Sequence, residues 1–345
     1  MSKSAKAFSP KEFTCWVKAE SAAGTSVLGT SMLQLDVDSV SYPTLNITQA
    51  LDLKNGGRVL KDADFFQDNT LRVVELGISG TMHEDAGHQL LMQNICNDYT
   101  TNPAVSATYT PPSISYEDGD GAASTNATAG DTMTVVIAGV DETNPGTGNV
   151  QLSNTRNLVF PGMVCTNFTL NADAGTEGGR VKFSATLQSG KKPTFNDATT
   201  CGGTYYVGTD TKSFNTSSEH LCAGLEVVMG NFTVTLDNPA VFYGMYASGY
   251  EGVTRGAEFA VTFDTQVKYD SVTKDLVHTF DTQTAASITS ANLFEFTNNN
   301  AFGVDIDNGV LTNVAYSEGD IMMLDVSGKA TSDGSTVLVT FDCNE

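Results

Sequence analysis

The stretch VCTNFTLNADAGTEGGRVKFSATL, residues 164–187, decides the fold class of this chain. Every second position before the turn is apolar or Thr, and the alternation resumes after the glycine-rich segment DAGTEGG. A period of two is the side-chain period of a β-strand, and glycines between two such runs are typical of a hairpin. The stretch predicts an antiparallel hairpin. Its inward-facing residues are expected to be Val164, Thr166, Phe168, Leu170, Val181, Phe183, Ala185 and Leu187.

The period of two recurs along the chain and is interrupted by two short helical patterns. After His83 the apolar spacing becomes helical, with His88, Leu91, Met92 and Ile95 on one stripe. A second helix is expected in DSVTKDLVHTF, with Asp270 or Ser271 as N-cap and Val272, Leu276 and Phe280 on one face. Further strands are expected at 71–82, 132–140, 232–236, 257–263, 320–330 and 335–342, the last two as a pair joined by the turn TSDG.

The order of these elements occurs twice. A strand, a short helix and a strand hairpin are expected over 71–187 and again over 253–342. The two segments have little sequence identity, so the repeat is one of pattern.

Composition favours a mainly β protein. The chain has 345 residues, 40% hydrophobic and 17% charged, with 32 glycines and many Thr, Asn, Ser and Val residues. Its net charge of −22 argues against a surface that binds DNA phosphates; the same charge also keeps a protein soluble. The N-terminus lacks an apolar signal core, and no uninterrupted apolar run is long enough to cross a membrane.

The segment GTMHEDAGHQLL, residues 80–91, resembles a zinc-protease motif without meeting its geometry. Such a motif needs histidines four positions apart on a helix, whereas His83 and His88 are five apart. That spacing would separate them by about 140° around a helix. We therefore assign no metal site, and neither His220 nor His278 has a second cluster beside it.

Other features also have ordinary interpretations. The six cysteines show no C-x-x-C spacing, which favours reduced structural thiols over disulfides or metal ligands. The DGDG pattern at Asp118 and Asp120 lacks the carboxylate that closes a calcium loop, so a solvated loop is favoured. No G-x-S-x-G elbow, P-loop or dinucleotide fingerprint occurs. We expect a protein that is not an enzyme, with no catalytic, cofactor-binding or metal residues.

Several segments together resemble the tail tube proteins of long-tailed bacteriophages. WVKAESAAGTS has the acidic residue, small-residue run and Gly-Thr of that family's start, here Glu20, Gly24 and Thr25. LRVVELGISGTM followed by HEDAGHQLLMQNI is similar to its strand, Ser-Gly-Thr turn and short helix. The 160–190 hairpin and the run from 230 to 264 follow in the family's order. The resemblance covers most of 15–345, and the polar segments 97–150 and 190–220 depart from it.

The resemblance implies a structural virion protein with a tail-tube β-sandwich or barrel, in two tandem copies. The expected organisation is an arm and first strand at 1–45, one β domain at 46–215 and a second at 216–345. Subunits would form rings that stack into a hollow tube, either homotrimers with pseudo-sixfold symmetry or homohexamers. The implied partners are other copies, a tape measure protein, and tail terminator and baseplate proteins, with assembly in the host cytoplasm and no membrane.

Charge and loop length add three expectations. An acidic lumen would let DNA pass without specific binding. The arm before 45 and the loop at 50–70 would carry ring-to-ring contacts, because long polar segments need a partner to order them. Deletion of residues 1–20 is expected to spare soluble expression and abolish polymerisation. Two alternatives stay open: another β-rich virion protein, such as a capsid decoration or baseplate subunit, and a secreted adhesin or carbohydrate-binding module.

Overall fold

The protein is mainly β. The computed structural model describes residues 13–29, 32–43, 48–51, 65–68, 73–83, 85–96, 104–106, 113–115, 132–139, 157–196, 203–204, 219–244, 250–256, 258–282, 292–298, 302–331 and 338–343. Within these, strands dominate and there are two α-helices, α1 (Ala86–Cys96) and α2 (Leu276–Thr282). None of the described helices has the length and apolar character of a membrane crossing.

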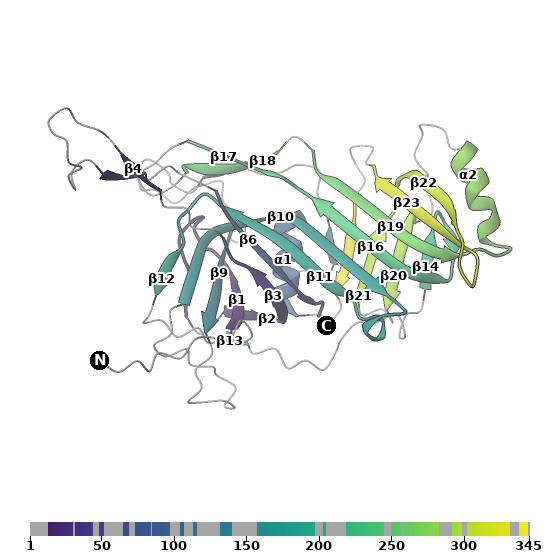
Figure 1. The fold of residues 1–345 in the computed structure, drawn as a ribbon, viewed down its shortest axis with the longest axis horizontal. Coiled ribbons are helices and arrows are strands. Elements are labelled where there is room, and N and C mark those ends of the chain that lie inside the picture. Colours follow the sequence, from purple (N-terminus) through teal and green to yellow (C-terminus); the bar gives the residue numbers. More distant parts are fainter. Residues whose placement is uncertain are drawn as a thin grey trace.

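The long strand β10 (Asn157–Asp173) belongs to two sheets at once (Figure 1). Its first part pairs with β9 (Met133–Gly139) and β12 (Thr194–Asn196), and its last part with β11 (Lys182–Ser189) and β16 (Met229–Asp237). The strand changes direction at Pro161 and Gly162, where Gly162 has a φ of 66°. Proline lacks a ladder donor and glycine tolerates positive φ, so this dipeptide suits the bend.

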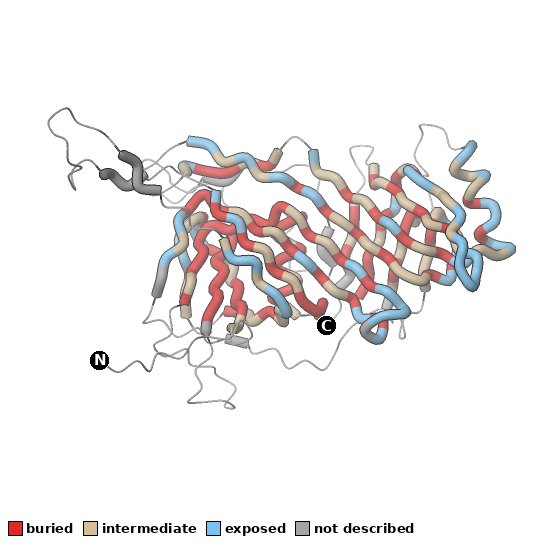
Figure 2. The backbone as a smooth tube through the Cα atoms, viewed as in Figure 1, coloured by how far each residue is buried: buried red, intermediate tan, exposed pale blue. Residues whose placement is uncertain are grey.

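The last part of β10 lies inside an eight-stranded sheet, called here the large sheet. Its order is β3-β6-β11-β10-β16-β19-β23-β22, and every neighbouring pair is antiparallel. Along most of these strands buried and more exposed residues alternate, as expected for a sheet with one face in the core (Figure 2). The remaining strands are β3 (Val37–Ser41), β6 (Val74–Thr81), β19 (Ala260–Lys268), β22 (Gly309–Ser317) and β23 (Met323–Ala330).

The large sheet consists of two four-stranded halves with the same pairing order. In β3-β6-β11-β10 the strand before α1 pairs with the return strand of the following hairpin; in β16-β19-β23-β22 the strand before α2 does the same. The β10–β16 pairing joins the two halves edge to edge. Each half therefore has a strand, a helix and a hairpin in that order, but the hairpin of the second half is β22–β23 and not the predicted pair 320–330 and 335–342.

Both halves also carry β-bulges at matching places. One bulge lies between Val37 and Ser39, opposite Gly80 and Ser79 of β6; its counterpart lies between Met229 and Asn231, opposite Val267 and Gln266 of β19. The second pair of bulges lies in the two hairpins. In β10–β11 the bulge is between Cys165 and Asn167, opposite Leu187 and Thr186. In β22–β23 it is between Leu311 and Asn313, opposite Gly328 and Ser327.

The predicted 164–187 hairpin is confirmed, but its inward alternation is wrong before the bulge. Phe168 and Leu170 face the core as expected. The extra residue in the bulge shifts the phase, so Cys165 joins the main core, and Val164 packs in a separate small cluster with Ala23 and Val253. A bulge changes which residues share a face without leaving a clear signal in apolar alternation.

The first part of β10 lies in a smaller sheet with order β13-β2-β1-β9-β10. Its other members are β1 (Phe13–Ala19), β2 (Met32–Leu35) and β13 (Gly203–Thr204). Trp16 and Val17 at the centre of β1 are buried. The region 1–45, where the sequence indicates an arm and a first strand, thus contains β1, β2 and β3, and α1 packs against β1, β2 and β10.

A six-stranded sheet packs on the core face of the second half of the large sheet. Phenylalanine rings join the two layers: Phe232 contacts Phe296 at a centroid distance of 4.6 Å, and Phe263 contacts Phe294 at 5.0 Å. The order is β15-β14-β20-β21-β24-β7. The strands are β15 (Leu225–Glu226), β14 (Glu219–Cys222), β20 (Phe294–Asn298), β21 (Phe302–Ile306), β24 (Thr340–Cys343) and β7 (Ala104–Ser106).

The expected last strand pair is wrong as a pair. β23 pairs with β22 and β19 in the large sheet, whereas β24 pairs with β21 and β7 in the six-stranded sheet. Alternation identifies a strand and its buried face but not its neighbour. The first predicted helix is confirmed, since α1 begins shortly after His83. The second begins later than expected: Asp270 accepts the backbone N–H groups of Val272 and Thr273, a 3-10 turn follows at Thr273–Asp275, and α2 starts at Leu276, so that Val272 is exposed and not on the packed helical face.

Two small sheets complete the described structure. β17 (Ala240–Tyr243), β18 (Gly252–Arg255) and β8 (Ser113–Ser115) form one, and β4 (Thr48–Leu51) and β5 (Phe65–Asp68) form the other. β4 lies away from the main sheets in Figure 1, and β5 pairs with it. Asp118, Asp120 and most of the polar segment 97–150 lie outside the described residues.

Candidate functional site

The face of the large sheet that points away from the core is mostly polar along the described strands. Its strand positions carry six carboxylates, Asp38, Glu75, Asp173, Asp237, Asp264 and Asp325, and three lysines, Lys182, Lys268 and Lys329. Most other positions on this polar face are hydroxyls or amides. They include Ser79, Asn167, Thr169, Asn171, Ser184, Thr186, Gln188, Asn231, Thr233, Thr235, Thr262, Gln266 and Ser327.

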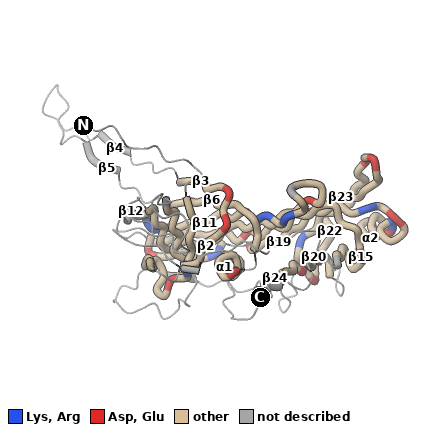
Figure 3. The backbone as a smooth tube through the Cα atoms, turned by 90° about the horizontal axis from the view of Figure 1, so that it is seen from below, with Lys and Arg blue, Asp and Glu red and all other residues tan. Residues whose placement is uncertain are grey.

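Each lysine of the polar face has a carboxylate partner. Lys182 Nζ lies 3.0 Å from Asp38 Oδ2, and Lys268 Nζ lies 3.8 Å from Asp270 Oδ2. Lys329 pairs with Glu258 and lowers the pKa of that carboxyl, through a hydrogen bond first and its charge second. Both acidic and basic positions occur along the described chain in Figure 3. This face therefore has no concentration of unpaired positive charge along the described strands.

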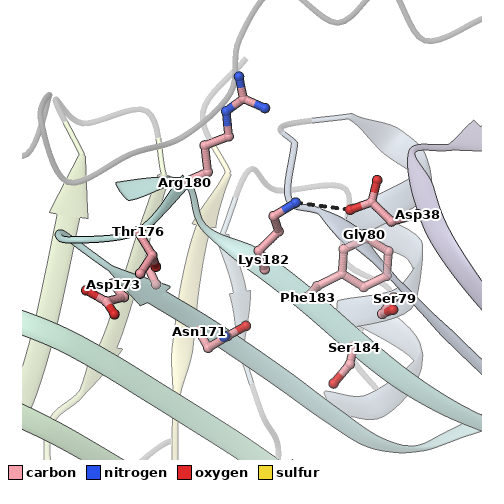
Figure 4. Close-up of a pocket in the computed structure, with 11 residues that line it drawn as sticks. Asp38, Ser79, Gly80, Asn171, Asp173, Thr176, Arg180, Lys182, Phe183 and Ser184 are labelled. Carbon is pink, nitrogen blue, oxygen red and sulfur yellow. Dashed lines mark hydrogen bonds and ion pairs between the residues drawn. The ribbon is translucent and has the colours of Figure 1, made fainter. Parts of the chain in front are cut away.

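A polar cavity of about 350 Å³ opens on this face beside the β10–β11 turn (Figure 4). Lys182 points toward Asp38 across the cavity, while Arg180 points away from that pair. Asp173 lines the opposite side together with Asn171 and Thr176, so both signs of charge are present. The mixture does not favour one class of charged ligand.

The two histidines of the zinc-like segment do come together, but each is bonded to a carboxylate. His83 Nε2 lies 2.8 Å from Asp36 Oδ2, His88 Nδ1 lies 2.8 Å from Asp85 Oδ1, and the two rings meet edge to face at 5.5 Å. His83 precedes α1, so the angular argument for two residues on one helix does not describe this pair. The hydrogen bond with His83 lowers the pKa of Asp36, although burial opposes the shift.

Among the described residues, no group of three or more metal-ligating side chains could hold an ion. His88 is fully buried, and its ring packs edge to face on Phe183 at 4.9 Å. The two histidine–carboxylate pairs link the end of β6, the start of α1 and the segment before β3. The role of these histidines is therefore structural.

Glu20 holds the bend of β10 in place. Its carboxylate accepts hydrogen bonds from the hydroxyls of Thr132 and Thr134 and from the backbone N–H groups of Gly24 and Gly162, at 2.6 to 2.9 Å. Burial raises the pKa of Glu20, and these four hydrogen bonds act in the opposite direction. Gly24 thus donates its backbone N–H to Glu20, and Glu20 in turn bonds to Gly162 at the junction of the two sheets.

Arg255 is a second buried connector that the sequence did not indicate. Its guanidinium donates to the carbonyls of Cys165 at 2.7 Å, Asn94 at 2.8 Å and Asn238 at 3.1 Å. Asn94 lies in the last turn of α1, where a cation is favourable, and Cys165 lies at the β10 bulge. An isolated arginine after a turn gives no pattern from which these partners could be found.

Four of the described cysteines are buried and lie in no disulfide, in agreement with the structural thiols that the sequence predicts. Cys15, Cys96, Cys165 and Cys222 are free, and burial raises the pKa of Cys15, Cys165 and Cys222 to about 12. A thiol with so high a pKa is almost wholly protonated near neutral pH and reacts slowly. These thiols are therefore core residues.

The large sheet ends in two edges. Among the residues that the structure describes, β3 pairs only with β6, and β22 only with β23. Open edges present backbone donors and acceptors to another strand.

No protein-family model matches this chain, and no curated protein matches it.

Proposed function

We propose that this chain is a tail tube protein, a structural virion subunit that assembles into stacked rings around a channel for phage DNA. The observation that carries the proposal is the large sheet: two four-stranded halves in the same order, joined edge to edge and open at both ends. A unit that joins to itself once within a chain has the edges needed to join again between chains. The ordered resemblance in the sequence points to the same function.

The matching bulges support two tandem copies of one unit. Paired side chains at matching register positions support it further, because their sizes are exchanged. At one position Phe183 lies opposite Gly80 in the first half, and Leu324 lies opposite Val267 in the second half. At another, Leu187 lies opposite Leu76 in the first half, and Gly328 lies opposite Phe263 in the second half. A large residue beside glycine replaces two residues of middle size, so packing is retained while sequence identity is lost.

A homotrimer is the ring size that we favour over a homohexamer. Three chains of eight strands give 24 strands in six equivalent halves, with three junctions within chains and three between them. Closing the sheet in this way pairs every β3 edge with a β22 edge and leaves no open ladder. Six chains would be needed only if the two halves acted as a single unit.

The polar face of the large sheet would then line the channel. Its hydroxyl and amide side chains, slight excess of carboxylates and paired lysines offer DNA phosphates few cations to bind. DNA binding through counterion release requires unpaired Lys or Arg at the phosphates. Such a lumen suits passage without retention.

Stacking of rings requires contacts away from the sheet edges. The β4–β5 hairpin lies within the polar segment expected to make them, and we propose it as a ring-to-ring element. The ends of the tube would meet the tape measure protein and the terminator or baseplate proteins.

Negative-stain electron microscopy of the purified protein, with native mass spectrometry of its rings, tests the proposed function. We expect hollow tubes, and rings of three chains. Rings of six chains would overturn the trimer. Closed particles or rings that never stack would favour a decoration or baseplate subunit, and monomers that bind a glycan array would favour the adhesin alternative.

A further inference from the structure

The two free edges of the large sheet each carry an exposed tyrosine on the core-facing side. Tyr42 follows β3 and has the parity of Val40, which packs against the core; Tyr316 of β22 lies opposite buried Leu324. Both tyrosines are 52% exposed. Large aromatic side chains on the apolar side of an unpaired strand end indicate a surface that another strand covers.

The junction inside the chain supplies the register for that covering strand. At β10–β16, Leu170 lies opposite Val234, and both side chains are fully buried. Leu170 lies opposite Phe183 in the first hairpin, and Tyr316 lies opposite Leu324 in the second. When the two hairpins are aligned at their matching bulges, these two pairs fall at the same position. Leu170 and Tyr316 therefore occupy the same position in the two halves.

Val234 and Tyr42 correspond in the same way. Met229 lies opposite Val267 and Val37 lies opposite Gly80, each at the start of a matching bulge. Val234 comes five residues after Met229, and Tyr42 comes five residues after Val37. Within the chain Val234 is covered by Leu170, and the counterpart of Leu170 in the second half is Tyr316, which is exposed on β22.

We propose that β3 of one copy pairs antiparallel with β22 of a second copy so that Tyr42 lies opposite Tyr316 and Ser41 opposite Ser317. This inference rests on the proposed function and names the residues of its chain-to-chain junction. Half-buried Val40 and Val314 flank the tyrosines on the same side and extend the apolar strip. The Tyr316 ring already packs edge to face on Tyr269 at 5.6 Å, which orients it before pairing.

Cysteine pairs test the register. We would compare Tyr42→Cys/Tyr316→Cys with Tyr42→Cys/Val314→Cys, which reports a slip of two residues, and with Tyr42→Cys/Val310→Cys, six positions or about 20 Å along β22. Each single-cysteine variant controls for native thiols. Directly opposite residues have Cβ atoms about 4.5 to 5.5 Å apart, close to disulfide geometry. Assembled protein would be oxidised mildly and run without reductant.

The expected result is fastest cross-linking of the 42–316 pair, at least tenfold faster than 42–310, in a ladder that ends at three chains. Tubes whose cross-links form fastest at 42–314, or not at all at 42–316, would overturn the register while leaving the proposed function intact. Cross-linked 42–316 oligomers from a protein that never forms tubes would support the register and overturn the proposed function.

A charge on either edge gives an independent measurement. Tyr42→Asp and Tyr316→Asp would each bury a carboxylate in the junction, so we expect folded monomers and at least a hundredfold higher protein concentration for ring formation. Tyr243→Asp, on β17 outside the large sheet, is the matched control and should assemble normally. Unchanged assembly of both edge variants, with circular dichroism like that of wild type, would overturn the proposal.

Discussion

Glu20 accepts the backbone N–H of Gly162 at 2.9 Å, across 142 positions of the chain. The bond ties the residue after β1 to the bend at which β10 passes from the small sheet into the large sheet. Because both sheets share β10, the orientation of one relative to the other depends on this bend. The buried carboxylate therefore acts on the geometry of the whole chain.

Glu20→Gln should destabilise the protein by about 1–3 kcal/mol, because an amide nitrogen would face donors that now meet carboxylate oxygens. Burial raises the folded-state pKa of Glu20 above 4.5, so the folded protein binds the extra proton. The stabilising contribution of Glu20 is then largest below pH 4.5 and falls as pH rises through the folded pKa.

Urea unfolding of wild type and Glu20→Gln at several pH values between 4 and 8 measures this dependence. The difference in unfolding free energy between the two proteins should narrow as the pH rises. A difference that widens would mean that the four hydrogen bonds outweigh burial.

Phe263 and Gly328 should be coupled, since a Cβ at Gly328 would collide with the Phe263 ring. We expect Gly328→Ala to cost about 1–3 kcal/mol through overpacking. Phe263→Leu/Gly328→Ala should recover most of that lost stability, because the smaller leucine leaves room for the added methyl group. At the matching position of the first half, two residues of middle size, Leu76 and Leu187, lie opposite each other. Thermal and urea unfolding of the double-mutant cycle give the coupling energy.

Gly319→Ala is the control for that cycle, because its Cβ would meet only the Ile321 carbonyl, at 3.6 Å. It should change stability by about 0.5 kcal/mol or less. Additive effects of Phe263→Leu and Gly328→Ala would contradict the packing argument.

The N-terminal deletion must end before β1. Removal of residues 1–20 would take away Trp16 and Val17 from the core together with Glu20, so we now expect insoluble protein where the sequence favoured soluble expression. Removal of residues 1–12 should leave the described fold intact. The soluble fraction and electron micrographs of both deletions test this, and tubes from the longer deletion would refute it.

Lysines on the polar face should make the proposed tube retain DNA. Thr169 and Thr235 lie opposite each other at the β10–β16 junction, with their hydroxyl oxygens 3.4 Å apart. Thr169→Lys/Thr235→Lys should give salt-sensitive retention of double-stranded DNA, because unpaired cations release counterions from phosphate. Binding is measured over a range of salt concentrations.

The control is a second cross-strand pair outside the large sheet, Val241→Lys/Thr254→Lys. It adds the same charge and should leave DNA passage unchanged. Equal DNA binding by both double variants would place the channel elsewhere.

The sequence alone determined the mainly β class, the position of α1, the presence of a second helix after Asp270 and the inward-facing residues of the 164–187 hairpin beyond the bulge. These follow from the period of apolar residues, which depends on local geometry. The sequence singles out Glu20 only through the resemblance of its segment to a known family, and it does not single out Arg255 at all. Most of their hydrogen-bond partners lie 90 or more positions away along the chain.

Only the tertiary structure decided which strands are neighbours, where the bulges lie and which ends of the large sheet are open. Alternation marks the two faces of a strand but says nothing about its partner, and one inserted residue reverses the faces. Tyr42 and Tyr316 look like ordinary surface tyrosines in the sequence. Tyr42 and Tyr316 correspond in register to the buried pair Val234 and Leu170, and this correspondence can be seen only from the β10–β16 pairing. That pairing brings together segments that are distant in the sequence, so the sequence does not reveal it.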